Sequence, residues 1–168
     1  MGFDMNTAKG AQGVLYKATL PTLLDGDVGP LAGDSSGRPL PGDVCSVATI
    51  HASGAEGATI TGPTQTNLYG RGGIFTLDIT AHAGSTPTLD VKMQVVDAVS
   101  GKSVDVPNVV FAQKNSNVTT VLQVIPNIAA VGNLAVSSQV PYQYCFVYTI
   151  GGTGGPSFTF TLSVQYLR

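Results

Sequence analysis

The chain has 168 residues, of which 43% are hydrophobic and only 11% are charged, and it contains 21 glycines and 10 prolines. A chain of this length holds one domain, or a small domain with an arm. The formal net charge of −2 comes from 8 basic and 10 acidic residues, and no basic patch is available to neutralise nucleic-acid phosphates. No stretch approaches the roughly 18–20 apolar residues that a membrane-spanning helix needs. We therefore expect neither a nucleic-acid partner nor a membrane partner.

The compartment and the state of the cysteines follow from the N-terminal sequence. Residues 1–20 contain no charged segment followed by an apolar run, so we expect no secretory signal and synthesis in a cytosol. A disulfide between Cys45 and Cys145 is disfavoured in such a compartment. We predict that both are small buried side chains on strands, although a bridge between two sheets stays open as an alternative.

Residues 1–43 differ in composition from the rest of the chain. The stretch 25–43, DGDVGPLAGDSSGRPLPGD, is dense in Gly, Asp, Pro and Ser, which is typical of successive turns or an extended arm. An arm without a core of its own normally lies against another surface. We therefore predict an extended N-terminal arm over residues 1–43 and a folded domain over residues 44–168. The apolar side chains that could anchor the arm in a neighbour are Leu23, Leu24, Leu31 and Leu40.

The clearest strand signal lies in residues 73–97, where apolar and polar side chains alternate strictly on both sides of the turn-forming segment AGSTP. A period of two means that one face of each strand is buried and the other meets water. Gly84 and Pro87 interrupt the pattern and favour a turn. The pattern predicts an antiparallel pair of strands joined as a hairpin.

Further strands are predicted along the remainder of the folded domain. The segments with strand character are residues 44–51, 57–61, 103–112, 117–125, 142–150 and 157–167. Residues 128–138 are ambiguous between a strand and a short helix, and the glycine-rich segment 151–155 is expected to be a hairpin loop. About eight strands at this spacing predict an all-β fold, an antiparallel β-sandwich of either immunoglobulin-like or jelly-roll topology.

The residues that could carry chemistry are few and scattered. His51 and His82 have no Cys, Asp or Glu at metal-ligand spacing, and Glu56 is the only glutamate. Asp78 and Asp90 lie on the outer phases of the two strands of the predicted hairpin and could be neighbours, although a solvated surface explains them more simply. We predict a protein that is not an enzyme and that holds no cofactor and no metal.

One stretch of the arm resembles a recurrent segment of virion proteins of tailed bacteriophages. That segment has a Pro-x-Leu-x-Asp-Gly phrase followed by Gly-x-Leu and then Asp-x-x-Gly-Arg. In LPTLLDGDVGPLAGDSSGR it is carried by Pro21, Leu23, Asp25, Gly26, Gly29, Leu31, Asp34, Gly37 and Arg38. The resemblance, together with the apolar anchors, implies a partner-binding set in the arm: Leu23, Leu24, Asp25, Gly26, Gly29, Leu31, Arg38 and Leu40.

Two strand segments also resemble the β-sandwich of small phage structural proteins. They are FTLDITAHAGSTPTLDVKMQVVD and YCFVYTIGGTGGPSFTFTLSVQYL. Many relatives have a Gly-Gly-Thr-Thr-Trp turn after the Leu-Asp-Val strand, whereas this chain has DAVSGK and no tryptophan. The two resemblances together cover about half of the chain.

The resemblance implies a structural protein of the virion, assembled in the cytoplasm of a bacterial host. We expect a capsid decoration (cement) protein that binds the major capsid protein and neighbouring copies of itself, as a homotrimer. A neck, tail or baseplate component is the alternative within the same class. A sugar-binding module for host adhesion is a third reading, for which Tyr142, Tyr144 and Tyr148 could form a platform. Because Phe146 shares their strand phase, a buried stripe is favoured there.

Overall fold

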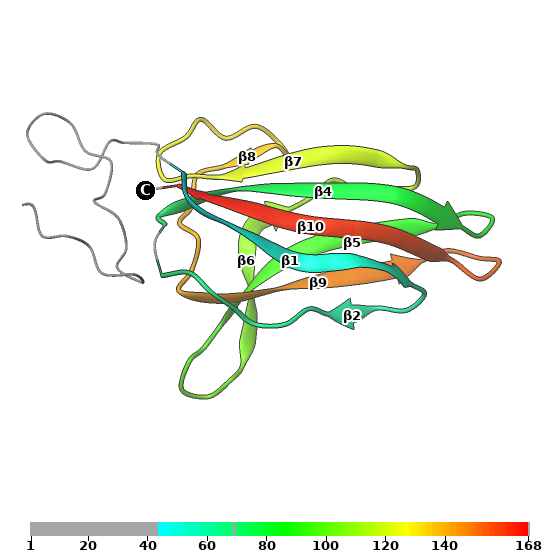
Figure 1. The fold of residues 1–168 in the computed structure, drawn as a ribbon, viewed down its shortest axis with the longest axis horizontal. Coiled ribbons are helices and arrows are strands. Elements are labelled where there is room, and N and C mark those ends of the chain that lie inside the picture. The colour runs from blue at the N-terminus through cyan, green and yellow to red at the C-terminus, as the bar shows by residue number, and fades with distance from the viewer. Residues whose placement is uncertain (1–43, 69, 168) are drawn as a thin grey trace, which may run out of the picture. The chain divides into compact units, whose positions relative to one another are not determined.

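The structure is a computed structural model, and it describes residues 44–68 and 70–167. The described part contains strands and no helix. The strands are β1 (Val44–Glu56), β2 (Ile60–Thr61), β3 (Gln65–Thr66), β4 (Gly72–Ala83), β5 (Thr88–Val96), β6 (Ser103–Val110), β7 (Val118–Val124), β8 (Ala135–Val136), β9 (Gln143–Gly151) and β10 (Ser157–Leu167). They form two sheets (Figure 1), with strand orders β1-β10-β4-β7-β8 and β2-β9-β5-β6. β3 pairs with β9 beside β2.

The pairing pattern is that of a jelly roll. β1 pairs with β10, β2 with β9, β4 with β7 and β5 with β6, all antiparallel. The chain is therefore one long nested ribbon whose tip is the β5–β6 turn. The ribbon then rolls up, which brings β10 beside β4 and β9 beside β5. The predicted all-β sandwich is confirmed, and this strand order resolves its topology in favour of the jelly roll.

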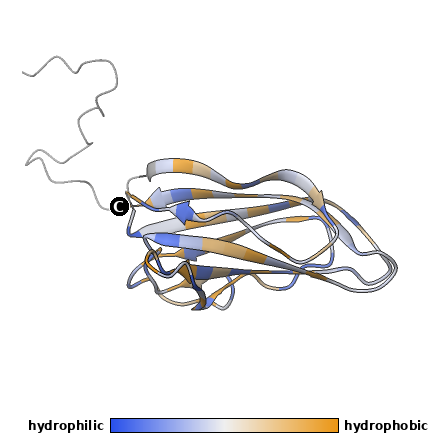
Figure 2. Cartoon of the chain, turned by 90° about the horizontal axis from the view of Figure 1, so that it is seen from below, coloured by the Kyte–Doolittle hydropathy of each residue, from blue (hydrophilic) through white to orange (hydrophobic). Residues whose placement is uncertain are grey.

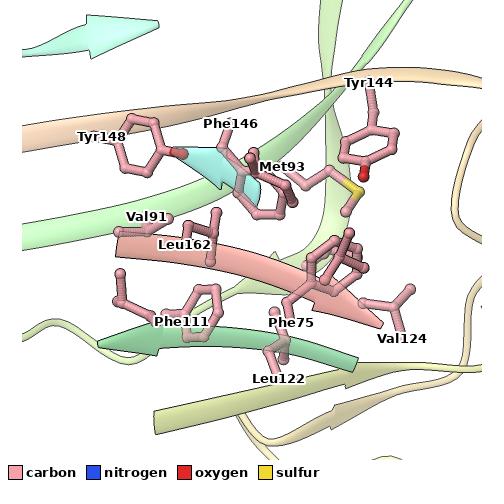
Figure 3. Close-up of a cluster of buried hydrophobic side chains, with 14 of the residues drawn as sticks. Phe75, Val91, Met93, Phe111, Leu122, Val124, Tyr144, Phe146, Tyr148 and Leu162 are labelled. Atoms are coloured by element: carbon pink, nitrogen blue, oxygen red, sulfur yellow. The ribbon is translucent and has the colours of Figure 1, made fainter. Parts of the chain in front are cut away.

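The core is formed by the inward-facing residues of the two sheets. Phe75, Leu77 and Ile79 of β4 are buried and alternate with polar neighbours, as do Phe158, Phe160, Leu162 and Val164 of β10. The opposite sheet contributes Leu89, Val91 and Met93 from β5 and Tyr144, Phe146 and Tyr148 from β9. Figure 2 shows the alternation as bands along the strands. Figure 3 shows part of this core, with Phe75 and Leu162 of one sheet facing Met93 and Phe146 of the other. Burying each such side chain stabilises the fold by roughly 1.5–3 kcal/mol.

The segment 73–97 is not a hairpin, and that prediction was wrong. β4 belongs to one sheet and β5 to the other, so residues 84–87 form an arch that crosses between the sheets. Asp78 and Asp90 consequently lie on opposite outer faces of the sandwich and are not neighbours. Alternation identifies the buried face of each strand, but the same pattern fits two strands that pair and two strands that face each other across a core.

The glycine-rich segment between β9 and β10 is likewise an arch, since these strands also belong to different sheets. The two arches pack together, because the Ser85 N–H donates to the Thr153 carbonyl at 2.9 Å and the hydroxyls of Thr86 and Thr153 lie 3.1 Å apart. Gly152 has φ +116°, and a Cβ there would lie 2.1 Å from the Thr86 carbonyl oxygen. The predicted hairpin loop is therefore an inter-sheet connection, and its position 152 admits only glycine.

The first strand is longer than predicted. It continues through Gly54 to Glu56, past the break expected at residues 54–57, because bulges absorb the irregularity. Its register against β10 shifts at three places, between Val44 and Ser46, between Thr49 and His51, and between His51 and Gly54. β1 is an edge strand, and bulges at an edge oppose pairing with another chain.

The other predicted segments are shorter or nearly unchanged. The segment 57–61 is reduced to β2, and the ambiguous segment 128–138 contains only β8, which pairs in parallel with β7. The segments 103–112, 117–125, 142–150 and 157–167 agree with β6, β7, β9 and β10 to within two residues at each end.

Candidate interaction surfaces

The partner-binding residues predicted in the arm lie outside the described residues. These are Leu23, Leu24, Asp25, Gly26, Gly29, Leu31, Arg38 and Leu40. The domain boundary after residue 43 and the expected function of the arm stay predictions.

The titratable residues within residues 44–68 and 70–167 form no group of three or more His, Cys, Asp or Glu that could hold a metal. His82 is exposed, and its Nδ1 lies 2.8 Å from the Asn117 Oδ1. The Asn117 Nδ2 donates to the Thr80 carbonyl, which leaves Oδ1 to accept the proton of His82 Nδ1. Asp78 accepts a hydrogen bond from the Thr119 hydroxyl at 2.6 Å. These contacts join neighbouring strands on the outer face of one sheet.

His51 is not at the end of a strand, as the sequence suggested, but in the interior between the sheets. Its ring stacks on Phe160 at a centroid distance of 4.5 Å and lies 5.1 Å from the ring of Tyr148. The bulge before His51 places it on the same side as its buried neighbour Ile50. Burial lowers the pKa of His51, and the Glu56 carboxylate, 3.7 Å from its Nε2, opposes that shift.

Tyr144 and Tyr148 of β9 both place their hydroxyl groups in the core, and the two hydroxyls differ in their hydrogen bonding. The Tyr144 hydroxyl lies 2.5 Å from the Tyr166 hydroxyl of the opposite sheet, so this pair links the two layers. The Tyr148 hydroxyl is buried and finds no hydrogen-bond partner among the described residues, and the same is true of the Nε2 of His51. Burial raises the pKa of both Tyr144 and Tyr148. The favoured reading of a buried stripe is confirmed for Tyr144 and Tyr148, and only Tyr142 of the proposed sugar platform is exposed.

Cys145 is a buried free thiol, as predicted. The side chain of Cys45 lies outside the described side chains.

Two exposed apolar side chains lie in loops at the end of the sandwich where β1 begins. Leu68 and Tyr142 are 61% and 60% exposed, and the backbone N–H of Asn67 donates to the Tyr142 carbonyl at 2.8 Å. Asn67 is the buried polar residue that fixes this loop, since its amide donates to the carbonyls of Gly70 and Val140 and its Oδ1 accepts from the Gly70 N–H. We call Leu68 and Tyr142 the apolar end patch.

A pocket of about 400 Å³ lies between β6 and the segment that contains β8, on one open side of the sandwich. Its buried floor includes Ala135 and Val136, while the half-exposed Val131 and the exposed Asn108 and Asn133 stand at its mouth. None of its lining residues is charged. Asn108 and Asn133 both have positive φ, 62° and 56°, a conformation that asparagine adopts more readily than most residues.

Sequence reasoning did not find this pocket. One wall is the end of β6 and the other is the segment around β8, which begins about twenty residues further along the chain. The one local signal is the segment NVV at 108–110, where Pro107 and the left-handed Asn108 interrupt the pairing of β6 with β5.

The comparisons with known proteins add no relative to this description. No family model, no curated protein and no solved structure matches the chain. Among the residues that the structure describes, no helix is long and apolar enough to cross a membrane.

Proposed function

We propose that this protein is a structural protein of a tailed-bacteriophage particle without enzymatic activity, and specifically a capsid decoration protein that stabilises the head. It binds the major capsid protein and neighbouring copies of itself, and it is assembled into the virion in the bacterial cytoplasm. The support from the sequence is the set of phage-like phrases in the arm and in the strands. Jelly rolls are frequent in viral capsid proteins, but fold alone does not determine function.

The observation that carries the proposal is the apolar end patch. Leu68 and Tyr142 stay exposed on backbone that buried hydrogen bonds of Asn67 hold in place, and a rigid exposed apolar group is a frequent feature of binding surfaces. β1 begins at the same end, because Val44 pairs with Leu167 and the Leu167 carbonyl lies beside Gly70. The end of the sandwich at which β1 begins therefore carries the apolar end patch as well.

The test is the copy number of the protein relative to the major capsid protein, measured by quantitative mass spectrometry of purified particles. A ratio near one supports decoration of the whole shell. A few copies per particle would identify a neck, tail or baseplate component instead, and absence from the particle would contradict the proposal.

A second experiment tests the patch itself. Particles that lack the protein are incubated with the wild type, with the double variant Leu68→Glu/Tyr142→Glu, or with Val121→Glu as a control. Val121 is an exposed valine on β7. The double variant should lose attachment while the control keeps it, because charges at the patch would have to be desolvated against the partner. Equal attachment of all three proteins would remove the patch from the binding surface.

A further inference from the structure

The β5–β6 turn is a rigid apolar knob. Val99 at its tip is 95% exposed and Val104 on its flank is 64% exposed. The carboxylate of Asp97 accepts hydrogen bonds from the N–H of Val99 and from both the N–H and the hydroxyl of Ser100. The backbone closes the turn, since the Asp97 N–H donates to the Lys102 carbonyl and the Gly101 N–H donates to the Asp97 carbonyl, each at 2.8 Å. In Figure 1 this turn extends away from the other strands.

The knob, which we define as residues 97–102, presents almost no charge at its tip. The negative charge of Asp97 is directed into the turn, where hydrogen bonds lower the pKa of its carboxyl group. Lys102 stands at the base. A turn already fixed by its own hydrogen bonds loses little conformational entropy when it docks, so an exposed valine on such a turn is well suited to insertion.

The pocket between β6 and β8 has the complementary character. It is uncharged, its floor is apolar, and its volume of about 400 Å³ admits side chains of the size of valine. One wall is a tight turn in which Val131 and Ala135 exchange backbone hydrogen bonds, each at 2.9 Å. The amides of Asn108 and Asn133 at the mouth can donate to carbonyl groups of an inserted turn. Neither surface has to bury an unpaired charge, which is the costliest step in forming such a contact.

A knob cannot fill the pocket of its own chain. The tip of the knob precedes β6, whereas Asn108 and Val110 near the other end of β6 line the pocket. The eight residue steps from Ser100 to Asn108 span roughly 25 Å along an extended chain. The contact must therefore form between two copies. A single contact leaves the pocket of one copy and the knob of the other unused, and such a head-to-tail contact closes into a ring when the rotation between copies allows it.

We propose that copies of this chain associate head to tail, with the knob of one copy seated in the β6–β8 pocket of the next. A single contact of this kind is small compared with the roughly 1,200–2,000 Å² of a stable interface. Association of isolated chains is therefore expected at micromolar or weaker affinity and strengthens when a ring closes. This contact is a property of the isolated chain, so it stands or falls separately from the proposed function.

The experiment is sedimentation velocity on the full chain from about 1 to about 300 µM. The wild type should change from monomer toward oligomer across this range. Val99→Glu disables the knob and Val131→Glu disables the pocket, and each should weaken association at least about tenfold. Val121→Glu serves as the control and should associate like the wild type. Circular dichroism melts check that the variants are folded, which their exposed positions favour.

The decisive measurement is made on a mixture of the two disabled variants. The Val131→Glu protein retains an intact knob and the Val99→Glu protein retains an intact pocket, so an equimolar mixture should form a one-to-one dimer and nothing larger. A wild type that stays monomeric at the highest concentration would overturn the proposal. Variants that associate like the wild type, or a mixture that stays monomeric while the wild type associates, would overturn it as well.

Discussion

Tyr144 and Tyr148 project from the same strand into the same core, and their hydroxyl groups allow a matched test of buried polar groups. Within residues 44–68 and 70–167 the Tyr148 hydroxyl has no hydrogen-bond partner, and a buried polar group without a hydrogen bond opposes folding. We expect Tyr148→Phe to raise the free energy of unfolding by about 1 kcal/mol. Urea denaturation monitored by circular dichroism measures this change, and a clear loss of stability would mean that the hydroxyl has a partner.

The reverse result is expected for Tyr144→Phe. This substitution breaks the hydrogen bond between the sheets and leaves the buried Tyr166 hydroxyl without its partner. The free energy of unfolding should fall by roughly 1–3 kcal/mol. The two variants remove the same atom from the same strand, so opposite signs in the same denaturation assay would exclude a general effect of removing a hydroxyl. If both variants lost stability equally, the difference in hydrogen bonding between the two hydroxyl groups would be contradicted.

His51 makes the stability of the sandwich depend on pH. Its pKa in the folded protein lies below the usual value of about 6.5, because burial beside Phe160 and Tyr148 outweighs the attraction of Glu56. The unfolded chain therefore binds a proton first as the pH falls. Stability should be complete above about pH 6.5 and should decrease as the pH is lowered below it.

Urea denaturation between about pH 7.5 and pH 5 measures this dependence. The carboxyl groups of Asp97 and Asp105, whose pKa values are also lowered, lose their contributions only below about pH 4. In His51→Phe the free energy of unfolding should no longer decrease over this pH window. His82→Gln, which changes the exposed histidine, should show the same dependence of stability on pH as the wild type. If the stability of His51→Phe depended on pH as that of the wild type does, another titrating group would be responsible for this dependence.

The position of His51 also shows the limit of predicting which side chains are buried from their alternation along a strand. Alternation from Ile50 would place the next side chain outside, and only the bulge against β10 turns His51 inward. A bulge depends on the partner strand, so it leaves no mark in the sequence of β1 itself. The burial of Tyr144 and Tyr148 was predictable, because Phe146 shares their phase within one uninterrupted strand.

At the scale of elements, the sequence predicts most long strands but not the partner of each strand. The patterns in β4, β5, β9 and β10 specify a buried face, and the structure confirms those faces. The connections were misjudged because a short Gly- and Pro-containing segment fits a hairpin and an arch equally well. The arches at residues 84–87 and 152–155 are recognisable only once the two sheets are in place.

The paired arches allow a matched glycine test. At Gly152 an alanine would have φ +116° and a Cβ pressed against the Thr86 carbonyl. The backbone conformation alone costs roughly 1–3 kcal/mol, and the steric conflict adds to this loss. At Gly155, where φ is +71° and a Cβ meets nothing within 4 Å, alanine should cost only about 1–2 kcal/mol. Thermal melts of the two variants compare them, and an equal loss would mean that the arches do not pack as described.

The edges of the two sheets share one property, which is that each is irregular or short. β1 carries its bulges, β2 and β8 have two residues each, and β6 leaves its partner around Pro107. Such edges resist pairing with strands of another chain. Contacts between copies are therefore expected through side chains, at the knob and the pocket.

At the scale of the whole molecule, the nested ribbon makes the beginning of the sandwich essential. β1 pairs with β10 along its entire length, and Val44 pairs with Leu167 at the other end of the chain. Every strand pair of the described part forms among residues 44–167. The sequence predicts a boundary after residue 43 from composition alone, but it cannot show that the first strand closes against the last.

Two truncations separate folding from attachment. Removing residues 1–40 leaves every strand pair of the described part intact, so the protein should melt cooperatively near the wild-type temperature. It should nevertheless fail to attach to particles that lack the protein, because the predicted anchors, among them Leu23 and Leu31, are gone.

Removing residues 1–52 also deletes Ile50 and His51 from the core and exposes the edge of β10, so that chain should not fold. Circular dichroism and co-sedimentation with particles measure the two properties. An unfolded chain after the shorter truncation would place residues before Val44 within the folded domain, whereas a folded chain that still attaches would move the binding surface to the sandwich alone.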